Sequence, residues 1–167
     1  LDLRAHVERT VDGPTTGDGD QRGVDPRGLT TELRARVAEH LLAVLEGKIA
    51  ASSSEVDAAL LAAAKLGEER SRTREALQAH LRAGAQSTRE LAALSLGLLG
   101  DPGCAPPLLA LARDLPLAHA LCGSRSIDAR TRAFAIYGLG LLGRRQGAGS
   151  VTLGLAREAL VELAQQQ

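Results

Sequence analysis

The chain has 167 residues, which is enough for one domain with a substantial core. Its twenty basic and twenty acidic side chains cancel, so we expect no global electrostatic attraction to nucleic acid or to anionic lipid. Its apolar residues are almost all Leu, Ala and Val, with Phe134 and Tyr137 as the only aromatic residues, which predicts a core of helices packed through small side chains. No run approaches the roughly eighteen apolar residues needed to cross a bilayer.

Residues 1–28 are predicted to form an irregular N-terminal arm. The chain opens in an apolar, helix-like phrase, LDLRAHVERTV, without the charged and apolar regions of a signal peptide. We interpret this phrase as the inside of a longer or processed precursor whose targeting segment is absent from the chain. Residues 11–28 are rich in Gly, Asp, Pro and Thr and lack an apolar period, which indicates a long loop.

Part of this arm is similar to the start of a calcium-binding loop. The segment Asp18-Gly-Asp20-Gln-Arg-Gly23 supplies two carboxylates. An EF-hand also needs an oxygen ligand at the fifth position and Glu at the twelfth, where this chain has Arg22 and Leu29. A flexible loop is therefore favoured, with an irregular calcium site as the alternative.

The first predicted helix covers 29–46. Its apolar residues form a stripe at three- and four-residue spacing, made of Leu33, Val37, Leu41, Val44 and Leu45. Gly47 follows, where a helix terminator is expected.

Six further helices are predicted in three pairs, at about 54–67 with 71–83, 87–99 with 104–114, and 128–142 with 150–165. Capping boxes at Ser54 with Asp57 and at Ser87 with Glu90 suggest two of the starts. Three other starts are predicted from N-caps at Ser71, Asp128 and Ser150. Asp101-Pro102 suits a turn or a helix entry.

One phrase occurs twice in the chain. TRELAALSLGLLG at 88–100 and TRAFAIYGLGLLG at 131–143 share eight of thirteen positions. Such self-similarity predicts stacked repeats rather than one unique core. Gly67, Gly100 and Gly143 are predicted to close the first helix of each pair, and the second interval is ten residues longer, so residues 115–127 are interpreted as an insertion.

The pattern of each unit is a capped helix, then a phrase such as LGLLGDPG, then a second apolar helix. This pattern resembles HEAT repeats over roughly residues 54–165. The closest resemblance is to compact bacterial HEAT-like units, including those grouped with phycobilisome-lyase HEAT-like repeats. The resemblance implies an all-α fold, namely a right-handed α-solenoid of about three helix pairs with units near 54–84, 87–114 and 128–165. An N-terminal helix and the irregular arm precede these units, and the whole solenoid spans 29–167. Small residues at Ala92, Gly97, Ala135, Gly138 and Gly140 are expected to let the helix backbones approach closely.

The motif Gly138-Leu-Gly-Leu-Leu-Gly143 matches the dinucleotide fingerprint GxGxxG on paper. That fingerprint needs a preceding strand and a helix that begins at the glycines. Here the glycines lie at the end of a helical phrase, so we interpret them as packing residues.

Cys104, His119 and Cys122 could supply three zinc ligands, but a fourth ligand is missing. Buried thiols that act as small apolar groups are favoured, and a Cys104–Cys122 disulfide is a second alternative. The chain has no recognisable catalytic Ser/His/Asp or Cys/His motif. We therefore expect no catalytic residue, cofactor or metal.

Arginines recur near the boundaries of the predicted units, and stacking could align some of them into a ridge. They form our candidate interaction surface: Arg70, Arg72, Arg74, Arg125, Arg130, Arg132, Arg144 and Arg145. Some HEAT-like proteins bind DNA, but zero net charge and the absence of Trp favour a protein-interaction surface or a solvated face.

These observations predict a non-enzymatic scaffold for protein–protein interaction, whose partner the sequence does not identify. The alternative is a structural subunit that self-associates through its repeat ends, although Arg157, Glu158 and Glu162 give the last helix a polar character suited to a cap. Nucleic-acid binding and lyase-type activity are further alternatives. Similar bacterial proteins are often exported, which favours an exported protein. Any function specific to one unit should lie where the two copies of the phrase differ, as at Glu90 against Ala133 and Leu94 against Tyr137.

Overall fold

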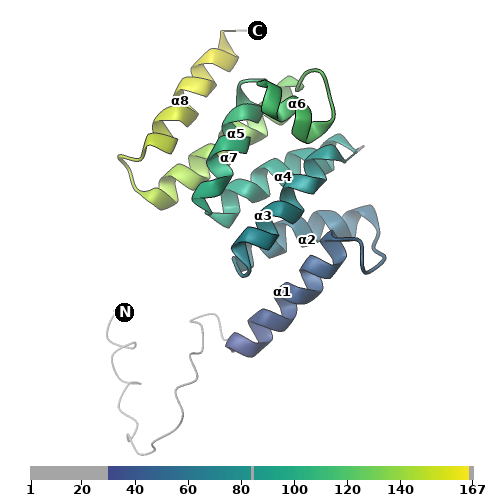
Figure 1. Ribbon diagram of the computed structural model, residues 1–167. Helices are drawn as coiled ribbons and strands as arrows, with labels where there is room; N and C mark the ends of the chain where they lie inside the picture. The colour runs from purple at the N-terminus through teal and green to yellow at the C-terminus, as the bar shows by residue number, and fades with distance from the viewer. Residues whose placement is uncertain (1–29, 84, 166–167) are drawn as a thin grey trace, which may run out of the picture. The chain divides into compact units, whose positions relative to one another are not determined.

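The computed structural model describes residues 30–83 and 85–165, and all regular secondary structure in this part of the chain is helical (Figure 1). This confirms the predicted all-α class. The α-helices are α1 (Thr31–Leu45), α2 (Ser53–Leu66), α3 (Arg70–Ala79), α4 (Gln86–Leu99), α5 (Ala105–Ala112), α6 (Pro116–Cys122), α7 (Ala129–Gln146) and α8 (Val151–Ala164). The predicted arm and its calcium-like segment lie outside the described residues.

The predicted helices occur at the expected places, with ends that differ by a few residues. Short 3-10 helices extend two of them, with His80–Arg82 continuing α3 and Pro102–Cys104 leading into α5. The predicted insertion, 115–127, contains a helix of its own, α6, which is followed by Gly123 with a φ of 63°. None of the described helices is both long enough and apolar enough to cross a membrane.

The predicted N-caps of α7 and α8 are confirmed. The Asp128 side chain accepts a hydrogen bond from the Thr131 backbone nitrogen at 2.8 Å, and the Ser150 hydroxyl accepts one from that of Leu153 at 3.2 Å. Asp101 likewise caps the turn before α5. Each cap satisfies an amide that has no partner within its helix.

Neither predicted capping box is confirmed, because the box of α2 lies two residues earlier and α4 has none. The box of α2 consists of Ser52 and Glu55 rather than Ser54 and Asp57, and α4 begins after Ala85 with no side-chain cap. A contact between helices replaces these local bonds, because Asp57 accepts a hydrogen bond from the Thr88 hydroxyl at 2.8 Å. The predicted N-cap of α3, Ser71, is also wrong, since α3 begins after Glu69.

Three more glycines follow the ends of helices as Gly123 does, whereas Gly143 lies within one. Gly47, Gly67 and Gly100 have φ angles of 71°, 69° and 72°, the left-handed conformation that suits a helix end. Gly143 was expected to close its helix but lies inside α7. A Cβ atom there would lie 2.7 Å from the Leu153 backbone nitrogen, so this glycine lets α8 approach closely.

The helices pack in a regular order. The first helices of the predicted pairs follow one another, with α4 on α2 and α7 on α4. The second helices fill the other side, since α4 also contacts α3, and α7 also contacts α5. At the end of the described chain α8 packs on α7 and α5, while α6 lies beside α5 (Figure 1).

Where α4 crosses α7, glycines allow the backbones of the two helices to come into close contact. A Cβ atom at Gly97 would lie 2.3 Å from the carbonyl oxygen of Gly138, and a Cβ atom at Gly138 would lie 2.9 Å from the carbonyl oxygen of Ala93. The predicted close approach is therefore confirmed for Gly97 and Gly138. Gly140 behaves differently, since nothing lies within 4 Å of its Cβ position.

The core is built from leucine and alanine. The largest side chains that are fully buried are Leu42, Leu60, Leu77, Leu81, Leu96, Leu99, Leu108, Leu111, Leu139 and Leu142. Phe134 packs against this cluster from its edge, and Tyr137 is exposed. The core thus has the small-residue character predicted from composition.

A substitution at the α4–α7 crossing tests this packing. We expect Gly97→Ala to lower the free energy of unfolding by about 3 kcal/mol, because the added methyl group meets backbone that has little room to move. Gly154→Ala is the matched control within α8, where nothing lies within 4 Å, and it should raise stability by about 1 kcal/mol. Urea unfolding measures both. Equal effects of the two substitutions would contradict the crossing.

Candidate interaction surface

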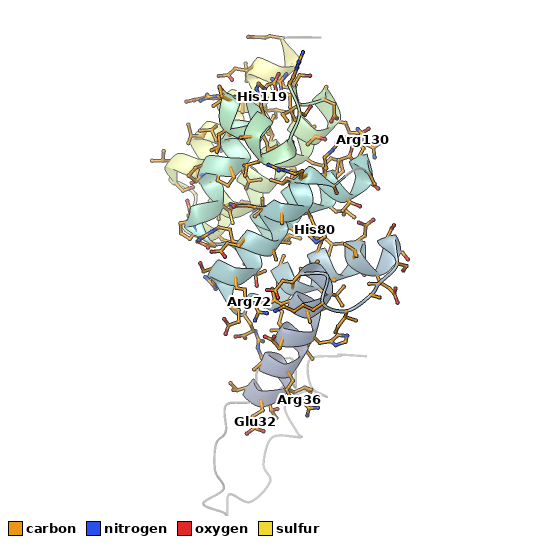
Figure 2. The ribbon with its side chains drawn as sticks, turned by 45° about the vertical axis from the view of Figure 1, so that its right-hand side comes forward. Glu32, Arg36, Arg72, His80, His119 and Arg130 are labelled. Atoms are coloured by element: carbon orange, nitrogen blue, oxygen red, sulfur yellow. The ribbon has the colours of Figure 1, made fainter. Side chains whose placement is uncertain are left out.

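Arg72 connects α3 to α1. Its Nε lies 2.6 Å from Glu46 Oε1, and its Nη1 lies 2.6 Å from Glu39 Oε2. His80, farther along, contacts the backbone oxygen of Leu45 at 3.0 Å (Figure 2). Hydrogen bonds from Arg72 and Lys48 lower the pKa of Glu46 from its ordinary value of 4.5 to about 2, and Arg72 also lowers that of Glu39. Arg72 is therefore a structural link within the molecule.

Several other arginines donate hydrogen bonds to carbonyl oxygens at the ends of helices. Arg132 Nε donates to the Ala112 oxygen at 2.9 Å, and Arg145 Nη1 to the Leu99 oxygen at 3.5 Å. Arg70 Nε donates to the oxygen of Gly67 at 3.4 Å. The last carbonyls of a helix lack partners within it and attract cations, so these arginines satisfy a need of the fold.

Arg74 and Arg130 form ion pairs. Arg74 pairs with Asp101, the residue that caps the turn before α5. Arg130, labelled in Figure 2, has its Nε 3.0 Å from Glu90 Oε1. The two side chains differ sharply in exposure, at 70 % for Arg130 and 3 % for Glu90. The pair links Glu90 of α4 to the first turn of α7.

Arg125 and Arg144 complete the predicted set. Neither forms a hydrogen bond or ion pair with another residue in the described part of the chain, and both are exposed. The eight arginines therefore do not act alike, because six have partners within the molecule. Their role in binding stays a prediction.

The cysteines are free thiols in the interior. Burial, with a smaller effect of the Asp101 charge, raises the pKa of Cys104 to about 12, and burial also raises that of Cys122. Both thiols are thus held in the protonated form, which is a poor nucleophile and a poor metal ligand. Across residues 30–83 and 85–165, no group of three or more His, Cys, Asp or Glu side chains could hold a metal ion.

His119, the third possible zinc ligand, contacts Asp114 instead. His119 Nε2 lies 2.8 Å from Asp114 Oδ1, which also accepts a hydrogen bond from the Ile127 backbone nitrogen at 2.7 Å. Burial acts to raise the pKa of Asp114, but these two hydrogen bonds, together with charge interactions with His119 and Arg132, keep the pKa below its usual value. Asp114, which directly precedes the insertion, thereby holds the last residue of the insertion close to its start.

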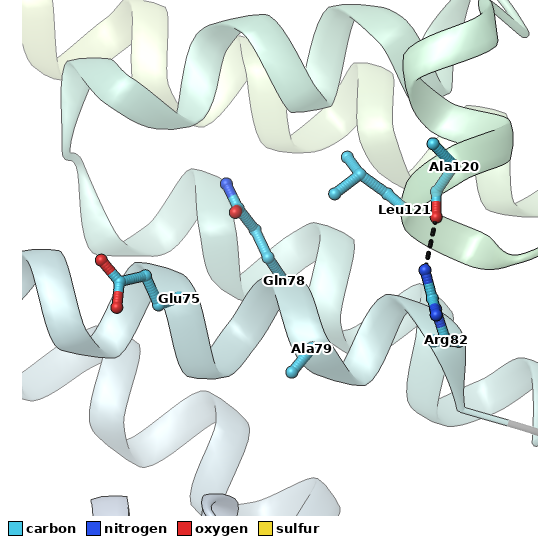
Figure 3. A pocket seen from close by; sticks show the side chains of 6 residues that line it. All are labelled: Glu75, Gln78, Ala79, Arg82, Ala120 and Leu121. Carbon is cyan, nitrogen blue, oxygen red and sulfur yellow. Dashed lines mark hydrogen bonds between the residues drawn. The ribbon is translucent and has the colours of Figure 1, made fainter.

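A groove of about 510 Å³ lies between α3 and α6. Glu75 and Gln78 line it from α3 and Leu121 from α6 (Figure 3). At its far end Arg82 Nη2 donates a hydrogen bond to the Ala120 carbonyl oxygen at 2.7 Å. Glu75 and Arg82 lie apart in Figure 3, so these two charged residues do not act together in the groove.

A second, apolar groove of about 290 Å³ runs between α7 and α8. We call its surface the C-terminal face, and define it by Ile136, Tyr137, Gly140, Leu153, Ala156 and Leu160. Tyr137 is 61 % exposed and Leu160 is 56 % exposed. Large apolar residues that gather on an exposed surface commonly mark an interaction site.

The sequence predicted a polar end at α8, which is only partly correct. Glu158 and Glu162 turn toward Arg113, whose Nη2 lies 3.2 Å and 2.9 Å from their carboxylates. Apolar residues remain exposed on α8, namely Val151, Leu160 and Val161. Sequence reasoning missed this face, although Tyr137 stood among the positions where the two copies of the phrase differ.

Comparisons of the chain with protein-family models, with curated proteins and with solved structures found no match.

The Arg72 link predicts a specific dependence on pH. Because the pKa of Glu46 is lowered in the folded state, its stabilising effect is full above about pH 4.5 and is lost as the pH falls toward 2. We expect Glu46→Gln to lower the melting temperature at pH 7, and the difference from the wild type to shrink between pH 4.5 and 2. Glu75→Gln, at an exposed carboxylate on α3, the helix that carries Arg72, is the control and should change the melting temperature little. A constant difference across this range would contradict the link.

Burial of the thiols predicts their reactivity. A colorimetric thiol reagent should detect two thiols per chain in denaturant. In the native state both thiols should react much more slowly than in denaturant. No reaction in denaturant without reductant would instead indicate the Cys104–Cys122 disulfide. Fast labelling of the native protein would contradict the burial of these side chains.

Proposed function

We propose that this chain is a HEAT-like α-solenoid that acts as a non-enzymatic scaffold for protein–protein interaction. The proposed solenoid is right-handed and consists of three helix pairs, α2 with α3, α4 with α5, and α7 with α8. In this interpretation α1 precedes the first pair, and α6 belongs to the insertion between the second and third.

The packing order supports the repeat interpretation. Each first helix packs on the first helix before it and also on a second helix of the preceding pair. A stack that contacts only its neighbours in this way is typical of solenoid repeats. The doubled phrase supplies equivalent contacts, because Arg89 donates to the Ala83 oxygen as Arg132 does to that of Ala112.

The C-terminal face is the observation that carries the proposed function. Its groove is lined almost wholly by apolar side chains, and both Tyr137 and Leu160 are more than half exposed. Exposed tyrosine and leucine around a concave apolar surface are suited to hold another protein. The α3–α6 groove lacks an equivalent group of exposed apolar residues and has Glu75, Gln78 and Arg82 along its length.

Self-association through the repeat ends is a second candidate, because the C-terminal face lies at one end of the helix order. An exposed repeat end can join another copy of the chain. Nucleic-acid binding has less support, since six of the eight arginines have partners within the molecule. Lyase-type activity would require a pocket with convergent polar groups, and its only support is the resemblance of the repeat phrase.

Affinity capture from the native source tests the proposal with two matched double variants. We expect Tyr137→Ser with Leu160→Ser to reduce the captured partner about tenfold or more, because it removes two apolar contacts from the C-terminal face. Arg125→Gln with Arg144→Gln changes two exposed arginines and should leave capture unchanged. Quantitative mass spectrometry measures the bound proteins.

The remaining outcomes separate the alternatives. Loss of capture with the arginine variant alone would keep the scaffold function and move it to the arginine surface. A molecular mass that rises with concentration on gel filtration would favour self-association. If no protein is enriched over a control matrix, the scaffold proposal is contradicted.

A further inference from the structure

The C-terminal face has a counterpart inside the molecule, where the occupant is visible. Four residues of α7 that line the groove have equivalents on α4, and α7 contacts three of those equivalents. In the order of the doubled phrase they are Ala133, Ile136, Tyr137 and Gly140, against Glu90, Ala93, Leu94 and Gly97. On α4, Gly97 and Ala93 meet Gly138, and Glu90 pairs with Arg130. The groove on α7 therefore continues the series of helix interfaces.

Small residues stand at equivalent positions in all three first helices, although Ala62 on α2 is exposed. Three residues before Gly67, Gly100 and Gly143 lie Ala64, Gly97 and Gly140, on the side of each helix that receives the next helix. Five residues before the same three glycines, the chain has Ala62, Ser95 and Gly138. Ala64, Gly97, Ser95 and Gly138 are buried, whereas the Cβ position of Gly140 is open. The receiving position is thus filled on α2 and α4 and unfilled on α7.

We propose that the C-terminal face binds one helix of a partner protein, placed on α7 as α7 is placed on α4. This inference rests on the proposed function and names the kind of partner. The partner helix carries Gly, Ala or Ser where it crosses Gly140, since the equivalent crossing of Gly97 and Gly138 leaves no room for a larger side chain. Helix-in-groove recognition through spaced apolar residues is a common mode of binding.

The groove also predicts what flanks the small residue. Tyr137 and Leu160 on its walls require apolar partner residues on both sides of the crossing. Ala133 stands where α4 has Glu90, so the partner needs no counterpart of Arg130 there. Arg157 lines the groove from α8 and favours an acidic residue on the partner helix. The occupant is therefore an amphipathic helix with a small residue at its centre.

A labelled peptide tests the inference on the full-length protein. The probe is a fluorescein-labelled peptide of residues 127–147, because α7 is the helix that fills the equivalent site on α4. Fluorescence anisotropy should show that it binds the wild type, and that Gly140→Leu weakens binding by about tenfold or more. Gly154→Leu is the matched control, also at an open helix position, and should leave binding unchanged. A peptide with Gly138→Leu should bind as weakly as the wild-type peptide binds Gly140→Leu.

Circular dichroism and the melting temperature establish that each variant is folded. Leu160→Asp, at an exposed position, gives the same test if Gly140→Leu does not fold. It should also weaken the binding of the peptide. Binding that is unaffected by either groove variant would overturn the inference.

Two further outcomes distinguish this inference from the proposed function. If the peptide does not bind the wild type at its highest soluble concentration, while the Tyr137 and Leu160 variant still loses its captured partner, the helix inference falls and the scaffold function stands. If gel filtration shows self-association that Gly140→Leu abolishes, a second copy occupies the face and the inference is overturned.

Discussion

The contact between the backbones of α4 and α7 is the constraint on which the rest of the stack depends. At Gly97 and Gly138 the two helices are so close that neither position accepts a Cβ atom. A core built at this separation leaves little volume for large side chains, which accounts for its leucines and alanines and for the single aromatic residue at its edge. The distance between helices, rather than hydrophobicity alone, therefore sets the composition.

Close stacking has a second consequence at the helix ends. When helices lie near one another, the carbonyl oxygens at the end of one helix face a neighbouring element and lose access to water. Arg132 and Arg145 donate hydrogen bonds to such oxygens on α5 and α4. A guanidinium group suits this role because it has several donors on a long stem. Much of the positive charge at the predicted unit boundaries is thus used to complete the fold.

The sequence predicted those features that local patterns determine. Apolar spacing located the helices, and glycines marked the ends of α1, α2 and α4 because only a local left-handed conformation was needed. The capping boxes failed for a physical reason. Asp57 had two possible partners, and the hydroxyl of Thr88, which is distant in the chain, prevailed over the nearby amide. The choice between Ser52 and Ser54 could not be read from a pattern that both residues satisfy.

The candidate site was predicted less well, because exposure depends on what covers a helix. Glu90 and Ala133 occupy equivalent positions in phrases that share eight of thirteen residues, yet the first is buried beneath α7 and the second lines an open groove. Nothing within either phrase reveals which copy lies at the end of the series. The same limit explains why the sequence listed eight similar arginines, six of which have partners within the molecule.

The position of Tyr137 gives the molecule a spectroscopic property of its own. The chain has no Trp and one Tyr, and that Tyr lies on the C-terminal face. Near-ultraviolet emission from the whole protein therefore originates almost entirely at one surface. A phenol ring that passes from water into an apolar contact changes its emission, so the unlabelled protein carries an intrinsic reporter of that surface alone.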